Sequence, residues 1–164
     1  MGNRRNTLLG IGALGGIFAG LRGFFESTPA QAAARKHEIT RSEDEWRKLL
    51  TPDQFYVLRR AGTERPFSSP LDKEKRAGVF HCAGCALPLF SSKTKFNSGT
   101  GWPSFWQPLE RAVDEDVDTT LGMRRVEVLC HRCGGHLGHV FDDGPKPTGL
   151  RYCMNGVALN FIAA

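Results

Sequence analysis

The chain has 164 residues, 40% of them hydrophobic, with five cysteines and a net charge of +5 at neutral pH. This length and apolar content fit one domain with a single core and argue against a multidomain protein. Its basic residues are scattered among acidic ones and form no basic stripe, so we expect no nucleic-acid partner.

The first 34 residues have the order of an export signal. Arg4-Arg5 precedes a glycine-rich apolar run over residues 8–21, and Ala30-Gln31-Ala32 follows with A-x-A spacing. A basic segment, an apolar segment and small residues at a cleavage site are typical of a secretory signal, and the paired arginines resemble a twin-arginine signal. We therefore expect a signal peptide over residues 1–34, a mature domain over 35–164, a periplasmic location and membrane contact only during export. An uncleaved N-terminal membrane anchor is the alternative.

Two short helices are predicted near the start of the mature domain. Ser42 and Glu45 have the spacing of a capping box, in which both side chains accept hydrogen bonds from free backbone N–H groups. Pro52 suits the first turn of a second helix, which Gly62 is able to end. These signals predict helices over residues 43–50 and 52–61.

From Gly78 onward, short runs of β-branched and aromatic residues alternate with glycine and proline, which indicates antiparallel strands. No later stretch keeps a helical period. The clearest predicted strands are residues 79–81, 88–90, 124–128 and 151–161. The chain is therefore predicted to be mainly β.

Four of the five cysteines form two C-x-x-C pairs, Cys82 with Cys85 and Cys130 with Cys133. Two such turns are able to complete a tetrahedral four-thiolate zinc site, which has no open position for substrate. We expect one structural zinc ion per chain that ties together distant parts of the domain. A redox C-x-x-C of the thioredoxin type is the alternative, but it requires a βαβ context that the chain lacks.

The fifth cysteine, Cys153, is a candidate nucleophile. Alternate residues of a strand share a face, so Arg151 and Asn155 would flank it, and a nearby cation lowers a thiol pKa. His136 and His139 lie just beyond the second cysteine pair and could supply a proton donor and a hydrogen-bonding partner. Other roles stay open: the cysteine as a buried apolar residue, and the histidines as zinc ligands or core residues.

A glycine-rich turn carries Trp102 between Gly101 and Pro103. A tryptophan held in this way offers a rigid aromatic wall for a methyl or thioether group. Taken alone, such a loop is more often structural than functional.

Together these motifs resemble the B-type methionine sulfoxide reductases, which reduce the R epimer of methionine sulfoxide. The resemblance covers about residues 40–162. In chain order, the motifs are Cys82-Ala83-Gly84-Cys85 with Pro88-Leu89-Phe90, Gly101-Trp102-Pro103-Ser104-Phe105, the stretch from Cys130 to Phe141, Asp143-Gly144-Pro145 and Arg151-Tyr152-Cys153-Met154-Asn155. The resemblance implies an Mss4-like fold of two antiparallel sheets, with short N-terminal helices and a zinc site distant from the active site.

The resemblance also implies a role for each site residue. Cys153 matches the nucleophile, which attacks the sulfoxide sulfur and becomes a sulfenic acid while His139 delivers a proton. Arg151 matches a residue that helps to activate the cysteine, and Trp102 matches the one that packs on the substrate methyl group. The remaining matches are His136 and Asn155 as polar active-site residues, and Phe105 and Val140 as substrate-binding residues. The expected substrates are oxidised proteins or peptides that carry methionine-R-sulfoxide.

One position departs from the family pattern. Many members form a disulfide with a cysteine two residues before the loop tryptophan, where this chain has Thr100. We therefore expect an external thiol to recycle the enzyme: a thioredoxin-like protein, a glutaredoxin-like protein or a small thiol. Two other classes stay open: a zinc-ribbon-like binding or chaperone module, and a thiol oxidoreductase that acts on disulfides. Cys153, Asn155 and Trp102 favour the sulfoxide reductase, because a binding module has no need of them.

Overall fold

A computed structural model of the chain describes residues 37–119, 122 and 124–164. The predicted signal segment, residues 1–34, lies outside the described residues. Within the part that is described, no helix combines the length and apolar character that a membrane crossing requires.

The two predicted helices are present as α1 (Glu43–Leu49) and α2 (Pro52–Arg60). Each begins at a capping box, formed by Ser42 with Glu45 in α1 and by Thr51 with Gln54 in α2. The predicted end of α2 is one residue late, because Ala61 takes the left-handed conformation (φ 50°) that was expected of Gly62. A side chain at Gly62 would meet the ring of Tyr56, so a larger residue here would require that exposed ring to move.

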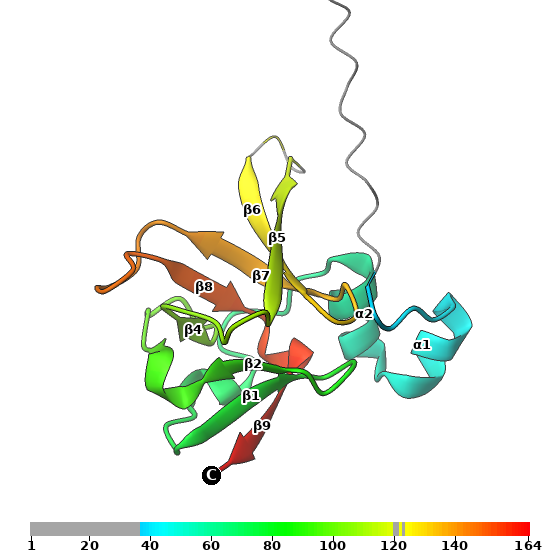
Figure 1. Cartoon of the computed structure of the whole chain (residues 1–164), viewed down its shortest axis with the longest axis horizontal. Helices are drawn as coiled ribbons and strands as arrows, with labels where there is room; N and C mark the ends of the chain where they lie inside the picture. The colour runs from blue at the N-terminus through cyan, green and yellow to red at the C-terminus, as the bar shows by residue number, and fades with distance from the viewer. Residues whose placement is uncertain (1–36, 120–121, 123) are drawn as a thin grey trace, which may run out of the picture. The chain divides into compact units, whose positions relative to one another are not determined.

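Nine strands in the described part of the chain form two antiparallel sheets (Figure 1). The smaller sheet has the order β2-β1-β9 and the larger one β3-β4-β8-β7-β6-β5. The strands are β1 (Gly78–Cys82), β2 (Pro88–Ser91), β3 (Lys95–Phe96), β4 (Ser104–Phe105), β5 (Val113–Asp118), β6 (Arg125–Cys130), β7 (His136–Phe141), β8 (Arg151–Met154) and β9 (Leu159–Ala163). This confirms the predicted fold class.

The predicted strand over residues 151–161 is wrong, because it is two strands that belong to different sheets. β8 lies in the larger sheet and β9 in the smaller one, separated by the short 3-10 helix η4 (Gly156–Ala158). At this turn the backbone N–H groups of Gly156 and Val157 bond the carboxylate of Glu64 instead of a neighbouring strand. The chain therefore leaves the larger sheet directly after β8.

Aromatic side chains join the two sheets. The ring of Phe105 in β4 stacks on Phe90 of β2 at 4.4 Å and meets the edge of Phe80 of β1 at 4.9 Å. Tyr152 of β8 is buried on the same side, with its ring 5.9 Å from Phe90. Since neighbours alternate along a strand, Cys153 lies on the other face of the larger sheet. The core thereby sets the direction of the candidate nucleophile.

Candidate active site and metal site

The four paired cysteines lie together, as predicted. Their sulfur atoms are all within 4.8 Å of one another, and Cys85 alone is not fully buried. The two turns have the same geometry: Ala86 and Gly134, which follow the second cysteine of each pair, have φ values of 58° and 65°. Each donates its N–H to the carbonyl of the first cysteine at 2.8 Å. A bound ion would therefore sit between two equivalent turns.

The chemistry of these donors fits a metal ion. Four thiolates are the ligand set of a closed structural zinc site, in which no position is left for substrate. Arg59 of α2 donates hydrogen bonds to Sγ of Cys133 at 3.3 Å and to its carbonyl at 3.0 Å. Hydrogen bonds from the other three thiols, together with the Arg59 charge, lower the pKa of Cys133. Hydrogen bonds within the same cluster raise the pKa values of Cys82 and Cys130, so Cys133 is the sulfur that most readily takes the deprotonated form that metal binding requires.

Cys153 lies in a row of polar side chains that crosses the larger sheet. It pairs with Ser104 of β4 on one side and with His139 of β7 on the other, and His139 pairs with Glu127 of β6. Residues directly opposite one another in neighbouring strands share a face. The sheet register thus brings a thiol, an imidazole and a carboxylate together.

The thiol of Cys153 is less acidic than the flanking cation Arg151 led us to expect. Burial raises its pKa, while Thr100, Arg151 and Ser104 act in the lowering direction. Arg151 is itself engaged, because its guanidinium donates two hydrogen bonds of 2.8 Å to Asp143. The expected effect of Arg151 is therefore present, but burial outweighs it.

A β-bulge places both histidines on the Cys153 face. In a regular strand, residues three apart point to opposite faces. The β6–β7 register shifts between Val128 and Leu129, so that Leu137 is an extra residue in β7. The rings of His136 and His139 consequently lie 5.4 Å apart.

Each histidine contacts a carboxylate. Nδ1 of His136 lies 2.6 Å from Glu127, and Nε2 of His139 lies 2.9 Å from Asp118, which also accepts from Arg125 at 2.6 Å. A carboxylate only accepts hydrogen bonds, so these nitrogen atoms carry protons. Burial lowers the pKa of His139, although the bond to Asp118 opposes this. Neither histidine belongs to the four-cysteine cluster, and zinc ligation is not their role.

A cavity of about 140 Å³ opens beside Cys153. Four predicted site residues line it: Trp102, His139, Cys153 and Asn155. None of the four clustered cysteines does. Asn155 is buried, accepts from the backbone N–H of Glu64 at 2.9 Å and donates to the Leu137 carbonyl at 3.1 Å. Its amide therefore ties the loop before η1 (Pro70–Lys73) to β7.

The structure does not bring every predicted residue to this cavity. Phe105 pairs with Tyr152 and is fully buried in the core, and Val140 also pairs with Tyr152 on that side of the sheet. Phe105 and Val140 were expected to bind substrate; neither lines the cavity, and both pack with the core. His136 is buried behind His139, and Arg151 contacts the ring of Phe141, which lines the cavity.

Sequence reasoning missed four lining residues: Thr63, Arg125, Gly138 and Phe141. The alternation of Val126 and Val128 in β6 carried a signal for Arg125, because it places that side chain on the face opposite the two valines. Thr63 had no such signal, since it lies in a loop that tertiary contacts position.

Two antiparallel sheets, a four-cysteine cluster and a separate cavity with one thiol define a small β-sheet protein whose candidate active site lies apart from its candidate metal site. The SelR domain matches residues 50–163. Proteins named peptide methionine sulfoxide reductase MsrB are similar over most of their length. The one from Methanosarcina barkeri is 58% identical over 75% of this chain and 87% of its own, and the one from Leptospira interrogans is 52% identical over 76% and 96%. The one from Bradyrhizobium diazoefficiens is 54% identical over 79% and 94%. The chain belongs to this MsrB family, which favours an enzyme over a non-catalytic binding module.

Proposed function

We propose that this protein reduces the R epimer of protein-bound methionine sulfoxide to methionine, with Cys153 as the nucleophile. The observation that carries the proposal is the cavity that Cys153 and Trp102 line together. Its volume of about 140 Å³ suits the methyl sulfoxide end of a side chain. The Trp102 ring offers the methyl group an aromatic surface, and family membership supports the same reaction.

The reaction balances with this one thiol. The Cys153 sulfur attacks the sulfoxide sulfur, the sulfur–oxygen bond of the substrate breaks, and methionine leaves. The cysteine is oxidised by two electrons to sulfenic acid, and the thiol proton ends on the oxygen that it gains. The methionine sulfur is reduced by the same two electrons.

The histidines would move the proton. Nε2 of His139 is engaged with Asp118, so delivery to the sulfoxide oxygen requires a proton on Nδ1. The Cys153 thiol is the natural source of this proton. Transfer of the thiol proton to the imidazole creates the thiolate nucleophile and the imidazolium acid in one step.

This pairing predicts a flat pH profile of kcat/KM around neutrality. Burial holds the pKa of His139 below its ordinary 6.5 and that of Cys153 above its ordinary 9.0. The reactive thiolate–imidazolium pair contains as many protons as the neutral pair, so its fraction is constant between the two pKa values. It falls below the lower pKa, where a proton is gained, and above the higher one, where a proton is lost. A rising limb between pH 7 and 8 would contradict this scheme.

The Arg151→Gln variant tests the direction of the upper limb. Since the Arg151 charge lowers the pKa of Cys153, its removal should move the alkaline limb to higher pH. The acid limb, which belongs to His139, should move less.

We further propose that an external thiol clears the sulfenic acid. The thiol condenses with it to a mixed disulfide and releases water, and a second thiol then frees Cys153. The hydroxyl of Thr100 lies 3.9 Å from Sγ of Cys153, and this group cannot form a disulfide. The four clustered thiols would be bound to zinc, the metal that their donor set and the family imply.

Recycling is testable in a single turnover. With one equivalent of sulfoxide and no reductant, mass spectrometry should show one oxygen added at Cys153, or its dimedone adduct, and one methionine per chain. An internal disulfide between Cys153 and a clustered cysteine, with release of metal, would overturn the proposal. The Thr100→Cys variant should instead form an internal disulfide and turn over faster with thioredoxin-like donors, because position 100 already touches the thiol.

We also propose that residues 1–34 direct export by a twin-arginine route, supported by Arg4-Arg5, the weak apolar run and Ala30-Gln31-Ala32. Cell fractionation of a tagged protein should find a shortened form outside the cytoplasm. Replacing both Arg4 and Arg5 with lysine should retain it inside. Full-length wild-type protein in the cytosol would refute export, and a full-length form in the membrane would support the anchor.

A further inference from the structure

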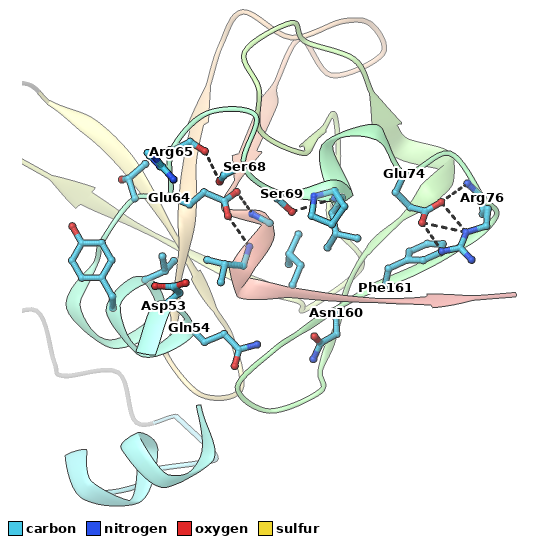
Figure 2. Close-up of a pocket in the computed structure, with 18 residues that line it drawn as sticks. Asp53, Gln54, Glu64, Arg65, Ser68, Ser69, Glu74, Arg76, Asn160 and Phe161 are labelled. Carbon is cyan, nitrogen blue, oxygen red and sulfur yellow. Dashed lines mark hydrogen bonds and ion pairs between the residues drawn. The ribbon is translucent and has the colours of Figure 1, made fainter. Parts of the chain in front are cut away.

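Glu64 lines a groove of about 730 Å³ (Figure 2), larger than the catalytic cavity. Its half-buried carboxylate lines the groove and accepts the backbone N–H groups of Gly156 at 2.6 Å and Val157 at 3.0 Å. Both carboxylate oxygens are therefore used by the turn that follows β8. The turn begins at Gly156, two residues after β8 ends at Met154 and three residues after Cys153.

The backbone of Glu64 bonds two residues that line the catalytic cavity. Its N–H donates to Oδ1 of Asn155 at 2.9 Å, and its carbonyl accepts from Nε1 of Trp102 at 3.2 Å. Glu64 thus joins the aromatic wall of the cavity to the segment that follows Cys153. Both of these partners line the cavity, whereas Glu64 itself does not.

We propose that Glu64 is a positioning residue, which holds the Trp102 ring at a fixed place relative to Cys153. The inference rests on the proposed function. A half-buried carboxylate is costly without hydrogen bonds, so its bonds to the η4 turn hold the Glu64 backbone in place. The carbonyl that Trp102 uses is part of that backbone. Without the hydrogen bonds of the Glu64 carboxylate, the Trp102 ring would be free to shift relative to Cys153. Small displacements of a positioning group reduce rates strongly.

Glutamine is the informative replacement. It has nearly the same shape, but it keeps one acceptor oxygen and turns an NH₂ group toward a backbone N–H. Glu74 provides the matched control. Its carboxylate lines the same groove but bonds Arg76, as Figure 2 shows.

The test is a double-mutant cycle on the full chain with a methionine-R-sulfoxide peptide and a dithiol. Glu64→Gln should lower kcat/KM about tenfold in the wild-type background and less than twofold in a Trp102→Phe background. Glu74→Gln should stay within twofold of wild type. The rate of Cys153 alkylation by iodoacetamide should not change, because the thiol keeps its neighbours.

Equal losses in both backgrounds, or no loss in either, would overturn the positioning role. A slowed alkylation of Cys153 would do so too, since the effect would then act on the thiol and not on Trp102. If Glu64→Gln does not fold, Glu64→Asp replaces it in the same cycle. Aspartate keeps the negative charge but is shorter, so it reaches the backbone N–H groups of Gly156 and Val157 less well. An inactive wild-type protein would refute the proposed function and is thus distinct from failure of this inference.

Discussion

Replacing Cys153 by serine is expected to abolish methionine sulfoxide reduction without unfolding the protein. Cys153 is the one cysteine outside the metal cluster, and a hydroxyl is far less nucleophilic than a thiolate at neutral pH. Loss of an essential nucleophile costs several orders of magnitude, so we expect kcat/KM to fall by about a thousandfold or more. The measurement is methionine released from a sulfoxide peptide under excess dithiol.

Met154→Leu is the matched control for this change. Met154 is the next residue in β8, is fully buried and points to the core, and a volume-conserving replacement is tolerated there. It should keep activity, and both variants should keep the thermal midpoint and metal content of the wild type. A Cys153→Ser protein that retains more than about one part in a thousand of the activity would remove Cys153 from its role.

Replacing Cys82 by serine is expected to cost the metal and the fold together. The Cys82 sulfur is fully buried within the cluster and lies 3.8 Å from that of Cys133. Apparent binding free energies of structural zinc are about 10–16 kcal/mol, comparable to the whole stability of a domain. We therefore expect a largely unfolded variant, measured by metal analysis and by circular dichroism on heating.

Cys130→Ser should behave in the same way, because the two turns are equivalent. Cys153→Ser serves as the control, since it removes a thiol outside the cluster and should retain the metal. Full activity and an unchanged thermal midpoint in metal-free protein would show that the cluster has no structural role.

Local patterns predicted the parts of the site that depend on neighbours in sequence. The C-x-x-C spacing predicted the cluster, because each turn brings its own two sulfurs together. Alternation in β8 predicted that Arg151 and Cys153 face away from Tyr152. Both patterns concern short stretches of regular backbone, where residue spacing decides direction.

The remaining features arise from contacts between distant segments. The bulge at Leu137 brings His136 and His139 to one face, and it is visible only in the β6–β7 register. The end of β8 depends on Glu64, which lies far away in the sequence. The pKa of Cys153 depends on burial, so a flanking arginine alone gave the wrong net direction. In each case tertiary structure outweighs the local signal.

The protein is proposed to reduce one epimer of methionine sulfoxide in the cavity beside Cys153. The most direct measurement incubates the purified protein with peptides that carry either the R or the S epimer, under excess dithiol, and quantifies methionine. A disulfide peptide runs in parallel. We predict many turnovers with the R epimer, none with the S epimer and no reduction of the disulfide beyond that by the dithiol alone. Turnover of the S epimer alone, or of the disulfide alone, would contradict the account.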